Sequence, residues 1–426
     1  MRTVIFGIIS YLLFAACSNA QTDFDKYFEN QSMRVDLILG GNKHMQSVYL
    51  LEIKQEPFWG GSINNLVDEL GYGEYHFTIR NKESDELIYS RGFCTLFEEW
   101  RTTEEAKSIN KAFYQTVTFP YPKEEVIFTL NERRKDGSYN ALLTMVINPD
   151  DTNIRKEKVP DYEVVKLVDN GEPANMVDLT FIAEGYQLDE MDKFKADVKR
   201  MADYILSMEP YKSQQHKINF WAVCSPSIDS EADNPRRDKW VNTAVNSSFN
   251  TFYIDRYLET GDVISIRDIA ACAPYDHICV LVNSDKYGGG GIYNHFSIGT
   301  SDHPSAREVM LHEIGHGFGG LADEYYTSDV AYQNFFDLNV EPWQPNITTL
   351  VNFDSKWKHL VDPSTPIPTP VSKKYEDVSG VFEGGGYVEK GVYRPAVNCR
   401  MKTNEAEGFC PACQAALTKM IEFVTD

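Results

Sequence analysis

The sequence lacks several features that would assign it to a special class of protein. It has no low-complexity tract and no internal repeat, and beyond residue 16 no apolar run approaches the roughly 20 residues that cross a bilayer. Basic residues are scarce, because 41 Lys and Arg stand against 63 Asp and Glu, which gives a net charge of −22. Such an acidic chain suits neither a nucleic-acid backbone nor an anionic membrane surface, so we expect no nucleic-acid partner and no transmembrane segment.

The composition that remains is that of a globular protein. Hydrophobic residues make up 42% of the chain and aromatic residues 13%, which is enough to fill more than one core. A length of 426 residues suggests two or three domains.

The N-terminus has the pattern of a secretory signal peptide over residues 1–20. Arg2 precedes an apolar stretch, Val4–Ala16, that is too short to span a bilayer. Two processing sites compete. Phe14–Cys17 resembles a bacterial lipoprotein box, in which Cys17 would carry a lipid anchor, whereas Ser18–Ala20 fits ordinary cleavage before Gln21. We favour the second site slightly and expect export from a bacterial cell, as a secreted or periplasmic protein or, if Cys17 is acylated, as an outer-surface lipoprotein.

Cysteine is also sparse, and export makes its pattern informative. Cys224 and Cys279 lie in apolar runs and are expected in the core. The close group formed by Cys399, Cys410 and Cys413 is the most plausible source of a disulfide. A structural zinc held by these three is the alternative, although no fourth ligand lies at the usual spacing.

The hydrophobic period divides the chain into two halves. From residue 21 to residue 158, apolar and polar residues alternate in short runs separated by turns, which predicts an all-β, sandwich-like domain whose last residues, 148–158, form a polar linker. From 159 to 426 the pattern predicts a mixed α/β domain. Its expected strands are 176–183, 218–223 and 278–282, and its expected helices are 191–205 and one that begins at Pro411.

The residues best suited to chemistry are His312, Glu313 and His316. The preceding residues favour a helix, and two histidines four residues apart project from one helical face within reach of one metal ion. Glu313 lies at the edge of that face, where it can accept a proton from a metal-activated water. The pattern therefore predicts a catalytic zinc site.

A third ligand should follow the helix. Gly319 and Gly320 allow the helix to stop and the chain to turn back toward the metal. Ala322 cannot bind a metal, and the next two residues are both carboxylates. We favour Asp323, because a short side chain suits a tight approach, with Glu324 as the alternative. The unused acid would bond to a histidine or to the turn.

The stretch from His312 to Tyr325, His-Glu-x-x-His followed by Gly-x-x-x-Asp-Glu-Tyr, resembles the bacterial immunoglobulin-A peptidase family of zinc metallopeptidases. Other segments agree with that family: Ala183–Tyr186, Val280–Ser284, Tyr287–Gly289 and Cys399–Cys413. The resemblance implies a metzincin-like catalytic domain after an N-terminal β-rich domain, Zn²⁺ as cofactor, secretion, and a protein or peptide substrate. It does not imply cleavage of immunoglobulin A.

The same resemblance assigns further roles. In metzincins the third ligand lies three residues after the glycine, where this chain has Ala322. A methionine-bearing turn beneath the zinc forms an apolar floor, and Met401 is its candidate.

Two glycine runs are candidates for the substrate site. Gly289 and Gly290 precede the histidine helix, and a strand there could bind an extended peptide by strand addition. The second run, 384–386, is followed by Tyr387 and Tyr393, either of which could donate to an oxyanion.

Together these residues predict a zinc-dependent endopeptidase in which Glu313 is the general base. Two alternatives remain. One is a noncatalytic surface or glycan-binding protein with a relict peptidase domain, which an intact Glu313 disfavours. The other is a zinc amidase or deacetylase acting on cell-wall or glycan material.

Overall fold

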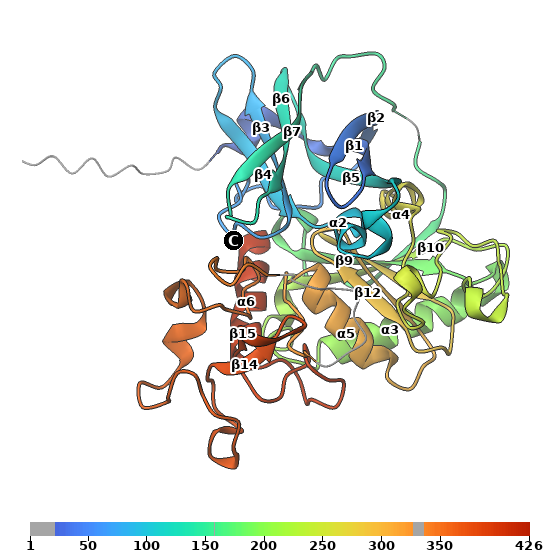
Figure 1. Cartoon of the computed structure of the whole chain (residues 1–426). Helices are drawn as coiled ribbons and strands as arrows, with labels where there is room; N and C mark the ends of the chain where they lie inside the picture. Colours follow the sequence, from blue (N-terminus) through green and yellow to red (C-terminus); the bar gives the residue numbers. More distant parts are fainter. Residues whose placement is uncertain (1–21, 157, 327–335) are drawn as a thin grey trace, which may run out of the picture.

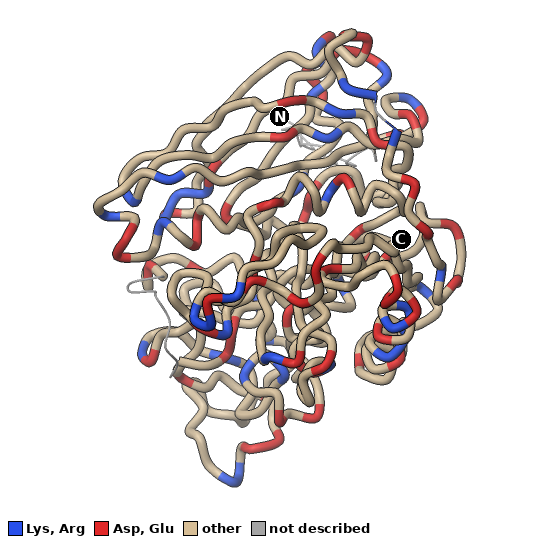
Figure 2. The backbone as a smooth tube through the Cα atoms, turned by 90° about the vertical axis from the view of Figure 1, so that its right-hand side faces the viewer, with Lys and Arg blue, Asp and Glu red and all other residues tan. Residues whose placement is uncertain are grey.

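The structure, a computed structural model, describes residues 22–156, 158–326 and 336–426. An N-terminal β region stacks on a larger α/β region (Figure 1). The predicted signal peptide and Cys17 lie outside the described residues. None of the described helices combines the length and the apolar character that spanning a membrane requires. Acidic and basic residues are spread over both regions rather than gathered on one face (Figure 2).

The N-terminal region contains two antiparallel sheets, with strand orders β2-β1-β5 and β4-β3-β6-β7. Its elements are α1 (Phe24–Tyr27), β1 (Phe28–Gly41), β2 (Gln46–Glu56), β3 (Tyr75–Asn81), β4 (Leu87–Phe93), α2 (Leu96–Arg101), β5 (Lys111–Pro122), β6 (Val126–Arg133) and β7 (Tyr139–Ile147). Alternate residues of the strands fill one core between the sheets, in which Phe77, Phe119 and Phe128 contact one another. The all-β, sandwich-like prediction is therefore confirmed.

The other face of the first sheet is polar and packs on the second region. Arg34 of β1 is fully buried, and its guanidinium contacts Asp36, Glu56 and, 2.7 Å away, Asp268 of helix α4 (Val263–Ala270). A buried charge is tolerated only when it is paired and hydrogen-bonded, as this one is. The two regions are therefore held together by the ion pair between Arg34 and Asp268 as well as by the chain segment that links them.

The second region is built on a six-stranded sheet of order β12-β13-β11-β9-β10-β8, parallel in its centre and antiparallel at both edges. Helices α3, α5 and α6 cover one face, and α4 covers the other. The strands are β8 (Glu163–Val168), β9 (Val177–Glu184), β10 (Ile218–Cys224), β11 (His277–Val282), β12 (Gly289–Ile292), β13 (Phe296–Thr300), β14 (Phe382–Gly385) and β15 (Val388–Arg394). Its α-helices are α3 (Met191–Ile205), α4 (Val263–Ala270), α5 (Ala306–Gly317) and α6 (Pro411–Thr425).

Several sequence-based expectations need correction. The segment predicted as a linker is partly fixed, because Arg155 pairs with Lys54 and Ile53 along the edge strand β2. No disulfide bond joins any two of the described cysteines, so the disulfide expected among Cys399, Cys410 and Cys413 is not found. Cys224 and Cys279 are buried in the core, as predicted.

Candidate active site

Helix α5 carries the two histidines and is pressed closely against its neighbours. A Cβ added at Gly315 would lie 2.6 Å from the sulfur of Met401, and one added at Gly317 would lie 2.4 Å from the Ser297 hydroxyl. Glycine at both positions therefore allows the helix to sit directly on strand β13 and on the Met401 turn, which sets the height of His312 and His316 above them.

The Nε2 atoms of the His312 and His316 imidazole rings lie 3.0 Å apart. The Nδ1 atoms are 2.9 Å from the carbonyl oxygen of Arg400 for His312 and 2.6 Å from that of Leu321 for His316. A carbonyl only accepts, so each Nδ1 must carry a proton, and a ring that is neutral then presents a bare lone pair at Nε2. Two lone pairs at this distance repel unless a cation lies between them.

Asp323 completes the cluster. Its Oδ1 lies 3.1 Å from Nε2 of His312 and 3.3 Å from Nε2 of His316, and no described group donates a hydrogen bond to this buried oxygen. Metal–ligand bonds of about 2.0–2.1 Å in a tetrahedron place the ligand atoms about 3.3 Å apart. The three atoms therefore fit one zinc ion with a fourth position open.

The electrostatics of the cluster also favour a cation. Burial lowers the pKa of His316, but the carboxylates of Asp323 and Glu313 outweigh it and raise the pKa to about 9. One proton can satisfy one ring, whereas a divalent ion satisfies all three ligand atoms at once. The residues present therefore suit a metal better than they suit a proton.

The turn after the helix lies at the glycine pair that the sequence indicated. The left-handed residue is Gly320, with φ of +64°, and not Gly319. Gly319 instead permits close packing, because a Cβ there would lie 2.5 Å from Leu417 of α6. Beyond the turn, the side-chain amide of Asn346 bonds both the N–H and the carbonyl of Ala322, which fixes the chain where Asp323 follows.

Glu324 points away from the histidines. Its carboxylate contacts the Asn346 amide at 3.1 Å and the Cys413 sulfur at 3.1 Å, and its backbone N–H donates to the carbonyl of Met401. The expectation that the second acid steadies a histidine is wrong, because backbone carbonyls take both imidazole N–H groups.

Glu313 lies beside the histidine pair, and its carboxylate is within 4.8 Å of their ligand atoms. Burial raises the pKa of the Glu313 carboxyl above its ordinary value, although the neighbouring imidazoles oppose this. A Cβ at Gly289 would lie 2.7 Å from Oε1 of Glu313. The glycine thus leaves the carboxylate room beside strand β12.

Met401 is fully buried directly beneath helix α5, against Gly315 between the two histidines. The turn around it supplies the Arg400 carbonyl to His312 and the Met401 carbonyl to Glu324. The role of Met401 as the methionine-bearing turn beneath a zinc ion stays a prediction.

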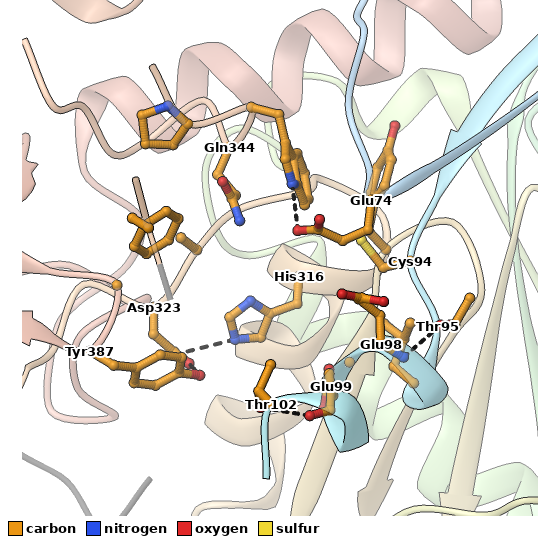
Figure 3. Close-up of a pocket in the computed structure, with 18 of the residues that line it drawn as sticks. Glu74, Cys94, Thr95, Glu98, Glu99, Thr102, His316, Asp323, Gln344 and Tyr387 are labelled. Carbon is orange, nitrogen blue, oxygen red and sulfur yellow. Dashed lines mark hydrogen bonds and ion pairs between the residues drawn. The ribbon is translucent and has the colours of Figure 1, made fainter. Parts of the chain in front are cut away.

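A cleft of about 800 Å³ opens in front of the cluster. His316, Asp323 and Tyr387 lie on one side of it, and Glu74, Glu98 and Glu99 of the N-terminal region lie on the other (Figure 3). Gly289 and Gly290 line it from β12, which is an edge strand of the central sheet. The contribution of the N-terminal region was not visible in the sequence, because no motif marks it.

Of the two candidate tyrosines, the structure brings only Tyr387 to the cleft. Its hydroxyl donates to Oδ2 of Asp323, and its backbone, at φ of +65°, bonds to Tyr325. Tyr393 pairs through its backbone with Thr348 and is absent from the described lining of the cleft. Sequence analysis missed Tyr325 and Arg256, which line the cleft and interact with each other. In the sequence, Tyr325 is only the last residue of the motif, and no pattern marks Arg256.

Comparisons with known proteins follow the same division of the chain. A family described as IgA Peptidase M64 matches residues 165–378 and 373–421, and a family described as Peptidase M64 N-terminus matches residues 23–144. No curated protein matches the chain significantly. The catalytic-region match covers more than half of the sequence and includes His312, Glu313, His316 and Asp323. The chain therefore belongs to the IgA peptidase M64 family, whose members are metallopeptidases.

Proposed function

We propose that this protein is an exported zinc-dependent endopeptidase whose metal is held by His312, His316 and Asp323. The observation that carries the proposal is the convergence of two bare imidazole Nε2 atoms and one carboxylate oxygen that receives no described hydrogen bond, all within 3.3 Å. Zinc bound there would supply a Lewis acid for the peptide carbonyl and would lower the pKa of water to about 7.

The chain's own groups would do the rest. Glu313 takes the proton of the attacking water at its carboxylate and later delivers it to the leaving amine. Tyr387 orients Asp323 through its hydroxyl. Tyr325 and Arg256 are placed in the cleft to donate hydrogen bonds to substrate oxygens.

The shape of the cleft favours a peptide over a glycan. Strand β12 is the outermost strand of the central sheet, and an isolated bridge joins its first residue, Gly289, to Tyr257. Beyond that bridge its glycines allow an extended chain to approach the backbone closely. A peptide that added to this edge would pass between the histidine pair and the N-terminal side of the cleft, which Glu74, Glu98 and Glu99 line.

Digestion of a proteome-derived peptide library by the purified protein, read by mass spectrometry, tests the proposal. We expect internal cleavages that disappear with a chelator and in Glu313→Gln. Release of acetate or sugar from cell-wall material, with no peptide cleavage, would overturn the proposal in favour of an amidase or deacetylase. No cleavage of either material would favour a noncatalytic protein.

A further inference from the structure

A second cluster of metal-ligating side chains lies directly behind the first. Glu324, Cys399, Cys410 and Cys413 place one carboxylate oxygen and three sulfurs within 4.8 Å of one another. All four residues are between 0% and 5% exposed, and none is among the described residues that line the cleft. The catalytic proposal uses none of these side chains.

We propose that these four residues form a closed structural zinc site. Zinc–sulfur bonds of about 2.3 Å in a tetrahedron place two sulfurs about 3.8 Å apart and a sulfur and an oxygen about 3.5 Å apart. The sulfurs of Cys399 and Cys413 are 3.7 Å apart, and Oε1 of Glu324 lies 3.1 Å from Cys413 and 4.0 Å from Cys410. These three distances lie within about 0.5 Å of the values that such an ion requires, and all four ligand atoms lie within 4.8 Å of one another.

The carboxylate of Glu324 points to a ligand independently of the sulfurs. The residue is fully buried, and its Oε2 has no hydrogen-bond partner among the described residues. Leaving a buried carboxylate oxygen unpaired is costly, so a cation beside it removes a large penalty.

The surroundings of the sulfurs favour thiolates. Cys410 and Cys413 have the Cys-x-x-Cys spacing common in zinc sites, and they stand at the start of helix α6, whose dipole favours negative charge. The backbone N–H of Cys410 donates to the sulfur of Cys399 at 3.3 Å. Arg394 and Lys402 act electrostatically on Glu324. Together with one Zn²⁺, these two cations balance three thiolates and one carboxylate.

A disulfide is the competing use of these cysteines. It would consume two sulfurs and leave the third facing the unpaired Glu324 carboxylate in a dry interior. The zinc site satisfies all four groups. It would also tie together the Asp323–Glu324 segment, the Met401 turn and the start of α6, the pieces that support the histidine site from behind.

Cobalt substitution of the wild-type protein tests this inference without any variant. The histidine–aspartate site contains no sulfur, so of the two proposed sites the cysteine cluster is the one that would give a sulfur-to-cobalt charge-transfer band in the near ultraviolet. We expect that band, together with two zinc ions per chain in the native protein. Absence of the band, with a pair of hydrogens missing from the intact mass of the denatured protein, would show a disulfide and overturn the proposal.

Matched variants locate the ion. Cys410→Ser with Cys413→Ser should lose one zinc and the band, whereas His312→Ala with His316→Ala should lose the other zinc and keep the band. Cys272→Ser, a half-buried cysteine outside the cluster, is the control and should keep both zinc ions. If the histidine variant binds no zinc and shows no cobalt–sulfur band, the proposal is wrong whatever the peptidase activity of the wild type.

Discussion

The two clusters that meet at Asp323 and Glu324 differ in ligand chemistry and in access to solvent. The histidine cluster uses two nitrogens and one oxygen, and its imidazoles are 13% and 16% exposed at the floor of the cleft. The cysteine cluster uses three sulfurs and one oxygen, and it is sealed in the interior. The neighbouring residues Asp323 and Glu324 can belong to different clusters because successive side chains of a non-helical segment point in different directions.

The contrast indicates that one chain can place catalysis and structural support in two separate clusters. Catalytic zinc sites keep three protein ligands and one open position, whereas structural sites are closed by four. On this account, Asp323 contributes to reactivity and Glu324 to rigidity, although they are neighbours of similar chemistry.

Substitutions of Asp323 and Glu324 should differ most strongly in their effects on zinc binding and hydrolysis. Asp323→Ala should lose the zinc of the histidine site and with it all measurable peptide hydrolysis, while one zinc per chain remains. Glu324→Gln should keep the histidine-site zinc and weaken the other. Zinc content and hydrolysis rate measured on both variants check this. If Glu324→Gln loses the catalytic zinc and Asp323→Ala keeps it, the assignment is reversed.

The second-largest effect is expected from replacing Glu313, the proposed general base. Glu313→Gln should lower the rate of peptide hydrolysis by about 10²–10⁴-fold, because the amide cannot take the proton of the attacking water. Both zinc ions should stay, since no metal ligand changes. A near-normal rate with full zinc occupancy would remove Glu313 from this role.

Sequence alone predicted much of the histidine site. The four-residue spacing of His312 and His316 on a helix determines their geometry locally, so the pattern is readable without a fold. Choosing between Asp323 and Glu324 required the path of the chain after Gly320, which depends on contacts with Asn346 and Met401.

The cysteine cluster could not be predicted in the same way. Its fourth member, Glu324, lies 89 residues from Cys413, and only the packing of α6 against the Met401 turn brings them together. The fold, too, could be predicted from the sequence only in part. Long periodic elements such as 191–205 were predicted, whereas short strands such as β12 and the polar sheet face around Arg34 depend on tertiary partners.

Met401 lies between the two clusters, and its substitution should have a smaller effect, on the stability of the protein. Met401→Ala should lower the free energy of unfolding by about 2–5 kcal/mol, because it leaves a cavity beneath α5. Met401→Leu, which conserves volume, should cost under about 1.5 kcal/mol. Denaturant unfolding of the zinc-loaded proteins measures both. Equal stability of the alanine variant and wild type would contradict the packing role.

The smallest effect should be confined to one cluster. Tyr387→Phe removes the hydroxyl that donates to Asp323, and outer contacts of this kind are typically worth about 10–100-fold in metal affinity. We expect that loss at the histidine site and no change in the cobalt–sulfur band. A weakened cysteine site in this variant would show that the two clusters are not separable in this way.

Zinc titration into chelator-treated protein, with bound zinc and peptide hydrolysis measured on the same samples, is the decisive test of the proposed catalytic zinc site. We predict no activity in metal-free protein and a return of activity in proportion to zinc bound at His312, His316 and Asp323. Asp323→Ala, titrated alongside, should regain none. Full activity in protein shown to be free of metal would contradict the claim that this cluster is a catalytic zinc site.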